Sequence, residues 1–186
     1  MSETPLSNDG RSADGSTDGD STTDVSVDDG SGDTPRRVAF VCVQNAGRSQ
    51  MAHAFAERER ARRGLGDRIE VVTGGTNPAD HVHGVVVEAM AEVGIDLADR
   101  TPRQLTPEEI RTCDVVVTMG CSAEDVCPAT WRGESRDWGL PDPHGQDVAA
   151  VRAIRDDVEA RVVALFDELA DEASRSTKPE PVVDDG

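Results

Sequence analysis

The chain has 186 residues, 36% of them hydrophobic, and a formal net charge of −18 at pH 7. This is enough apolar material for one globular domain with chain to spare, while so negative a charge argues against nucleic acid or an anionic membrane as a partner, because both require basic patches. Lys178 is the only lysine, and an acidic surface poor in lysine is typical of a salt-rich cytoplasm, where screening weakens the repulsion between like charges.

The sequence contains no apolar run of membrane-spanning length and no basic-then-apolar leader, so we expect neither a membrane span nor a signal peptide. Four cysteines in a domain of this size do not form the dense pattern of a secreted disulfide scaffold. We therefore predict a cytoplasmic protein whose cysteines are reactive or simply buried.

Both ends of the chain are predicted to be disordered. Residues 1–35 consist mainly of Ser, Asp, Gly and Thr and cannot bury enough apolar surface to offset the entropy of ordering; a partner-binding arm is the functional alternative. Residues 174–186 have the same character. The folded domain is expected to occupy residues 36–173.

The first predicted strand, Val38–Val43, leads through a tight loop into a helix. Loop and first-turn N–H groups at such a junction have no internal partners and form a seat for an anion. Arg48 adds a planar guanidinium that matches tetrahedral oxyanions, and thiols at a helix N-terminus beside an arginine are largely ionised at neutral pH. We predict that Cys42 is a thiolate nucleophile and that the oxyanion is bound by Val43, Gln44, Asn45, Ala46, Gly47, Arg48 and Ser49.

Three residues of this loop sharpen the prediction. Asn45 and Gly47 are residue types that tolerate positive φ, and Asn45 is expected to hold the loop conformation. Ser49 is expected to hydrogen-bond the Cys42 thiolate and so to favour its charged form. The alternative is a buried cysteine at the end of a strand, acting as a small inert hydrophobe.

The next segments alternate between helices and strands. We predict helices at 49–62 and 85–93, ended by Gly64 and Gly94, with a strand at 69–73 between them. Thr106–Glu109 carries the signature of a capping box. A buried strand at 114–119 and a long helix at about 147–170 follow, and this alternation indicates a single α/β domain with a parallel sheet.

Two sets of residues invite a metal or redox interpretation. His81 and His83 form a pair without a third partner, which is a weak metal signal, and we expect no metal site. Cys121 and Cys127 share one polar loop after the third strand, at the sheet edge where α/β proteins bind ligands. A disulfide relay with Cys42 is our preferred interpretation, with idle thiols or a zinc half-site as alternatives. Cys113 opens the buried strand and is expected to be structural.

Asp142 lies between Pro141 and Pro143. Both proline rings stiffen the backbone, so the carboxyl is held in a defined place. Such an acid can protonate a leaving oxygen and later activate water or a thiol. An aspartate chosen only for turn formation is the alternative.

The segment Cys42–Ser49 resembles the signature loop of the low-molecular-weight phosphotyrosine phosphatase superfamily, which includes the thiol-dependent arsenate reductases. The similarity covers about residues 36–172 and implies a four-stranded parallel sheet flanked by helices. The Asp142–Pro143 pair matches the place of the superfamily's general acid. Many members have a second cysteine just before the arginine, where this chain has Gly47. Any role of that neighbouring thiol is therefore absent.

Within the superfamily, residues 89–96 and the two loop cysteines look more like arsenate reductases than tyrosine phosphatases. The chain has no tyrosine to grip a phenol ring, and its tryptophans are Trp131 and Trp138. In the thioredoxin-coupled type the first relay cysteine directly follows the strand, where this chain has Gly120. The resemblance therefore leaves open whether Cys121 or Cys127 acts first.

The resemblance implies a cytoplasmic arsenate reductase that needs no metal or organic cofactor. Cys42 would attack arsenate held by Arg48, Asp142 would protonate the departing oxygen, and Cys121 or Cys127 would then form a disulfide that thioredoxin or a low-molecular-weight thiol reduces. One alternative is a low-molecular-weight protein-tyrosine phosphatase that hydrolyses phosphate monoesters through a phospho-cysteine. A second alternative is a non-catalytic oxyanion or redox sensor.

Overall fold

The computed structural model describes residues 34–176, so the predicted tails at 1–35 and 174–186 fall almost entirely outside the described residues. The elements, in chain order, are β1 (Arg36–Cys42), α1 (Arg48–Arg62), β2 (Ile69–Gly75), α2 (Gly84–Ala91), α3 (Pro107–Arg111), β3 (Val115–Met119), α4 (Ala123–Val126), β4 (Glu134–Asp137) and α5 (Val148–Ser176). None of the helices within this range combines the length and apolar character needed to cross a membrane.

The four strands form one parallel sheet in the order β2-β1-β3-β4, which confirms the predicted fold class. β1 is central, and its last residue, Cys42, is in register with Gly75 of β2 and Met119 of β3. The carboxyl ends of three strands therefore meet beside Cys42. This edge is where open α/β sheets bind their ligands.

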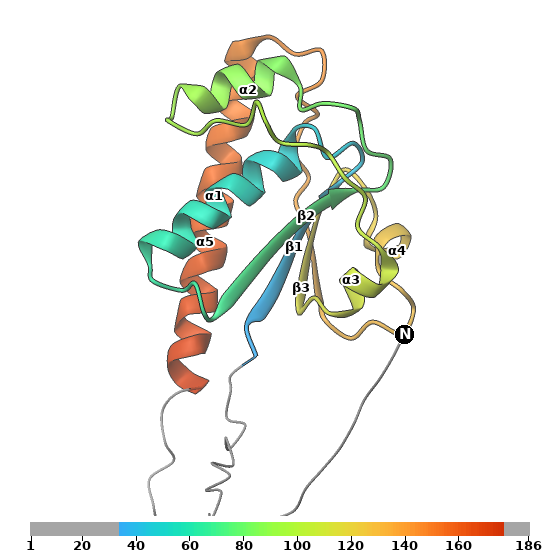
Figure 1. Cartoon of the computed structure of the whole chain (residues 1–186), viewed down its shortest axis with the longest axis vertical. Coiled ribbons are helices and arrows are strands. Elements are labelled where there is room, and N and C mark those ends of the chain that lie inside the picture. The colour runs from blue at the N-terminus through green and yellow to red at the C-terminus, as the bar shows by residue number, and fades with distance from the viewer. Residues whose placement is uncertain (1–33, 177–186) are drawn as a thin grey trace, which may run out of the picture. The chain divides into compact units, whose positions relative to one another are not determined.

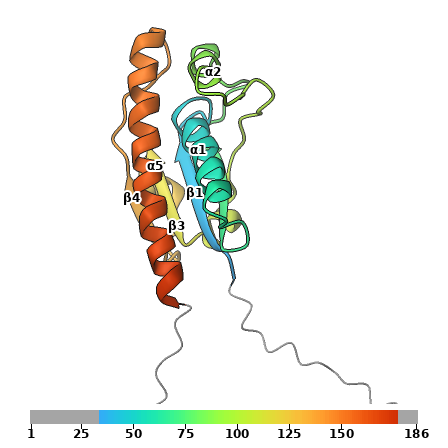
Figure 2. The same cartoon turned by 90° about the vertical axis from the view of Figure 1, so that its left-hand side faces the viewer.

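Side chains of β1 alternate between two core layers. Val38, Phe40 and Cys42 belong to the larger layer, which packs beneath α1, α2 and α5, whereas Ala39 and Val41 belong to the smaller layer beneath α3. Figure 1 shows α1 and α5 on one side of the sheet and α3 and α4 on the other, and Figure 2 shows α1 in front of β1 with α5 beside α1. Cys42 therefore points toward the layer of α1.

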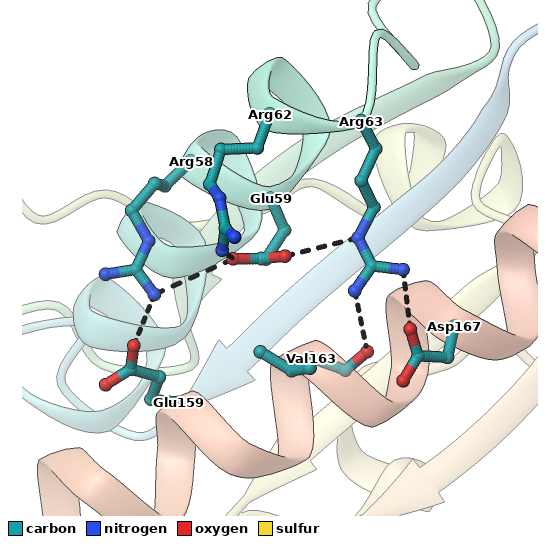
Figure 3. A network of polar contacts seen from close by, with 7 residues as sticks. All are labelled: Arg58, Glu59, Arg62, Arg63, Glu159, Val163 and Asp167. Atoms are coloured by element: carbon teal, nitrogen blue, oxygen red, sulfur yellow. Dashed lines mark hydrogen bonds and ion pairs between the residues drawn. The ribbon is translucent and has the colours of Figure 1, made fainter.

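A buried ionic cluster joins α1 to α5 (Figure 3). The Glu59 carboxylate is almost completely buried and accepts hydrogen bonds from Arg62 at 2.7 Å and Arg63 at 3.2 Å. Burying a carboxylate is costly unless cations pair with it. The cluster, called the Glu59 cluster below, consists of Arg58, Glu59, Arg62, Arg63, Glu159 and Asp167.

The capping box at α3 is present as predicted: Thr106 Oγ1 accepts from the Glu109 N–H at 3.2 Å, and the Thr106 N–H donates to Glu109 Oε2 at 2.8 Å. Other boundaries differ. β4 is a charged, largely exposed edge strand and so carries no apolar pattern. α5 extends beyond its predicted end to Ser176, because residues 171–176 contain no Gly or Pro to stop it. The loop that carries Cys121 and Cys127 includes the short helix α4.

Candidate active site

Cys42 ends β1, and its sulfur lies among hydrogen-bond donors. The Asn45 N–H donates to Cys42 Sγ at 3.2 Å, and Ser49 Oγ lies 2.9 Å from the same sulfur. Ser49 Oγ already accepts from the Asn45 side chain at 2.9 Å, so its own proton is available to the sulfur. Two hydrogen-bond donors therefore face the Cys42 sulfur.

The Asn45 side chain organises the loop. Asn45 adopts φ +50°, as predicted for a residue that tolerates positive φ, and it is completely buried. Its Nδ2 donates to Ser49 Oγ and, at 2.8 Å, to Thr73 Oγ1, while its Oδ1 accepts from Gln50 Nε2 and the Arg103 N–H, both at 3.0 Å. Every hydrogen-bonding site of the amide is used. We call this set the Asn45 cluster; it comprises Asn45, Ser49, Gln50, Thr73 and the Arg103 N–H.

Residues 76–83, called the strap below, run along the outside of the loop. Four N–H groups of the strap donate to four consecutive or nearly consecutive loop carbonyls: Thr76 to Cys42, Asn77 to Val43, Ala79 to Gln44 and His83 to Ala46, at 2.8–3.1 Å. The loop carbonyls therefore point outward. Within residues 34–176, no group accepts from the N–H groups of Gln44, Ala46, Gly47 and Arg48. These free donors at a helix N-terminus suit an anion.

Arg48 begins α1 and is nearly buried. Its Nη1 donates to the Leu140 carbonyl at 3.0 Å, and its Nη2 pairs with Asp142 Oδ2 at 3.2 Å. Gly120, with φ +79°, makes room for the guanidinium, because a Cβ there would lie 2.5 Å from Arg48 Nη1. This is the position directly after the strand, and no side chain fits there while Arg48 keeps its place.

Gly47 serves the site in a way that the sequence did not predict. Its φ is −142°, so Gly47 does not use its tolerance of a positive φ. A Cβ at Gly47 would instead lie 2.6 Å from Pro143 Cγ. Gly47 therefore allows the Asp142–Pro143 segment to close on the loop, and the His144 N–H fixes the carboxylate by donating to Asp142 Oδ1 at 3.0 Å.

One small pocket collects the predicted nucleophile, arginine and acid; it is lined by Cys42, Gln44, Gly47, Arg48, His83 and Asp142. His83 is a residue that sequence reasoning considered only as half of a metal pair. The described residues contain no group of three His, Cys, Asp or Glu side chains that could hold a metal. Thr73, Gln50 and the strap were also missed, since each acts through contacts with distant parts of the chain.

The other cysteines lie on the opposite side of the sheet from the Cys42 side chain. Cys121 and Cys127 are half-buried against the smaller core layer, and the Cys121 thiol donates to the Val41 carbonyl at 3.7 Å. Burial raises the pKa of both thiols, and the charge of Cys42 raises that of Cys121 further. Cys113 is buried, and the loss of hydration raises its pKa to about 11, as fits a structural cysteine. None of the four forms a disulfide.

Comparison with known proteins places these features in a family. Residues 37–175 match the family described as low molecular weight phosphotyrosine protein phosphatase. A Halobacterium salinarum protein named "Putative arsenate reductase" is 58% identical over 139 residues, which are 75% of this chain and 96% of that protein.

Two solved structures are also similar. A thioredoxin-dependent arsenate reductase of Corynebacterium glutamicum is 34% identical with a TM-score of 0.59; the match covers 73% of this chain and 62% of that protein. An arsenate reductase in a phosphate-binding state is 33% identical with a TM-score of 0.61, covering 72% of this chain and 98% of the other. With the family match spanning most of its length, the chain belongs to the low molecular weight phosphotyrosine protein phosphatase family.

Proposed function

We propose that the protein reduces arsenate to arsenite with the thiols of Cys42, Cys121 and Cys127. The observation that carries the proposal is the position of Cys121, whose thiol contacts the carbonyl of Val41, the residue before the nucleophile. The thiol lies on the other face of the sheet from the Cys42 side chain, so the proposal requires the loop after β3 to move and bring Cys121 to the Cys42 sulfur. A phosphatase needs only the Cys42 pocket, whereas a reductase also needs thiols that can reach it. Several relatives are named arsenate reductases, and these names also support a reductase over a phosphatase.

In the first step, the Cys42 thiolate attacks the arsenic of an arsenate held by Arg48 and the free loop N–H groups. A sulfur–arsenic bond forms, and one oxygen leaves. Asp142, which lines the same pocket, supplies the proton, so that water departs rather than hydroxide. Arsenic is still pentavalent at this stage.

In the second step, the Cys121 thiolate attacks the Cys42 sulfur. A sulfur–sulfur bond forms, the sulfur–arsenic bond breaks, and its electron pair stays on arsenic, which leaves as trivalent arsenite. Cys127 then attacks Cys121, which frees Cys42 and leaves a Cys121–Cys127 disulfide. An external dithiol such as thioredoxin, or a low-molecular-weight thiol, restores both thiols by taking up the oxidising equivalents.

Two observations support Cys121 rather than Cys127 as the first attacking thiol. Cys121 is near enough to Cys42 and Arg48 for both charges to affect its pKa, whereas the pKa of Cys127 is affected by burial alone. The Cys121 thiol also contacts the carbonyl of Val41, the residue before Cys42. Such chemistry requires a reducing compartment, consistent with the predicted cytoplasmic location.

The test is arsenate-dependent consumption of reductant by the purified protein at high salt, with Cys121→Ser, Cys127→Ser and, as the matched control, Cys113→Ser. We expect turnover by the wild type and by the control. Cys127→Ser should release one arsenite per chain and stop with a Cys42–Cys121 disulfide, and Cys121→Ser should release none. Because burial raises the pKa of Cys121, the relay step should accelerate about tenfold per pH unit below that pKa, as its thiolate fraction grows.

Three outcomes would contradict the proposal, the first of them only its thiol relay. Multiple turnover by the Cys121→Ser/Cys127→Ser double variant would remove the relay. Hydrolysis of an aryl phosphate without arsenate reduction would favour the low-molecular-weight phosphatase, which uses the same Cys42, Arg48 and Asp142. Absence of both activities would leave the oxyanion or redox sensor.

A further inference from the structure

Gln44 brings a side-chain amide into the Cys42 pocket. Its Oε1 lies 3.1 Å from His83 Nε2. Since an amide oxygen only accepts, the imidazole donates in this contact. Among residues 34–176, no group accepts a hydrogen bond from the Gln44 amide nitrogen, so the two N–H groups of the amide are free at the pocket.

His83 is held firmly enough to orient that amide. Its backbone N–H donates to the Ala46 carbonyl at 2.9 Å, and its own carbonyl accepts from Val86 and Val87 at the start of α2. Its ring lies against that of His144, with centroids 4.8 Å apart. Burial and the neighbouring His144 both lower the pKa of His83, which favours the neutral ring, and a neutral ring can carry its proton on Nε2.

The direction of the amide matters because an anion repels the carbonyl end and attracts the N–H end. A free glutamine beside an anion site presents either end. A donor fixed to Oε1 removes that freedom, so the amide reaches the anion already oriented and loses less entropy on binding. The His83–Gln44 contact spans the strap and the loop, two segments that are far apart in sequence.

We propose that the Gln44 side chain is a substrate-binding group that donates a hydrogen bond to the oxyanion in the Cys42 pocket, and that His83 is a positioning residue that aims it. The inference rests on the proposed function only for the choice of arsenate as one of the probes. Gln44 thereby adds a neutral, directional donor to the loop N–H groups and to Arg48.

The test measures binding of inorganic phosphate and of arsenate by calorimetry in a Cys42→Ser background, where no chemistry follows binding. Gln44→Leu removes the donor and keeps the size, and we expect about tenfold weaker binding or more, as for the loss of a hydrogen bond to a charged group. His83→Phe should weaken binding by a smaller factor, because the amide can still rotate into place. His83→Gln, which keeps an N–H donor, should restore much of the loss.

Matched measurements separate positioning from direct contact and from unfolding. His81 is an exposed histidine of the strap and does not line the pocket, so His81→Phe should bind both anions as the parent does. The double variant Gln44→Leu/His83→Phe should bind no more weakly than Gln44→Leu alone. Thermal unfolding of every variant should match the parent within about 2 °C, for substitutions of partly exposed side chains.

Unchanged anion binding by Gln44→Leu would overturn the proposal, and additive losses in the double variant would overturn the positioning role of His83. Failure of the wild type to reduce arsenate, together with weaker phosphate binding by Gln44→Leu, would refute the proposed function and leave this inference standing.

Discussion

Helix α1 connects two buried polar clusters of opposite chemistry. Near its N-terminus, the Asn45 cluster is made of neutral amide, hydroxyl and backbone groups. Near its C-terminus, the Glu59 cluster is made of charged side chains and ties α1 to α5 (Figure 3). The Asn45 cluster holds the Cys42 loop in place, whereas no residue of the Glu59 cluster lines the Cys42 pocket.

The difference shows that one cluster positions the catalytic loop and the other attaches helix α1 to helix α5. Neutral hydrogen bonds have strict geometry and add no net charge, so the Asn45 cluster fixes Cys42 and Ser49 while leaving Arg48 as the cation of the pocket. Ion pairs tolerate more variation in geometry and suit a contact between helices. Each cluster contains one buried polar atom without a hydrogen-bond partner in the described part of the chain: Gln50 Oε1 in the Asn45 cluster and Arg58 Nε in the Glu59 cluster.

The largest effect is expected at the Asn45 cluster. Asn45→Ala removes an amide with four hydrogen bonds and places Ala at φ +50°, so we expect about 3 kcal/mol of stability to be lost and turnover to fall about a hundredfold as the nucleophile shifts. Denaturant unfolding measures the loss of stability, and arsenate-dependent consumption of reductant measures the fall in turnover.

The control for this variant is Asn77→Ala. Asn77 lies in the strap, is exposed, and contacts the loop only through its backbone, so both quantities should stay near those of the wild type. Turnover that survives in Asn45→Ala would show that the cluster stabilises the fold without positioning Cys42.

The next effect is expected at the Glu59 cluster and only in stability. Glu59→Gln removes the buried carboxylate that Arg62 and Arg63 share, but Arg62 is largely exposed and Arg63 keeps Asp167. We therefore expect a loss of about 2 kcal/mol, as for the loss of hydrogen bonds to a charged group. Turnover below the unfolding temperature should change less than about twofold, because no residue of the cluster lines the pocket. A variant with normal stability and poor turnover would contradict the division between the clusters.

The smallest effect is expected at the rim of the Glu59 cluster. Arg63 pairs with Asp167 at 2.7 Å, but the Asp167 side chain is 66% exposed. Asp167→Asn should therefore cost less than about 1 kcal/mol, and this cost should disappear in about 1 M salt, where the screening length is about 3 Å. Denaturant unfolding at low and at high salt measures this cost. If the stability loss of Asn45→Ala were equally sensitive to salt, the contrast between the neutral and the ionic cluster would be wrong.

The sequence predicted the fold class and most of the elements because their signals are local. The apolar runs of β1 and β3 are continuous, and the Thr106 capping box lies within four residues. The charged edge strand β4 escaped notice, since pairing with β3 alone makes it a strand.

At the site, the sequence by itself determined which chemistry-bearing residues exist and, from the strand–loop–helix pattern, that Cys42 and Arg48 share a loop. Only the tertiary structure decided what lies against that loop: Asp142 on Arg48, Pro143 over Gly47, Thr73 and Arg103 on Asn45, and the strap that brings His83 to Gln44. These contacts join segments far apart in the chain. They follow from strand register and close packing, which no local pattern records.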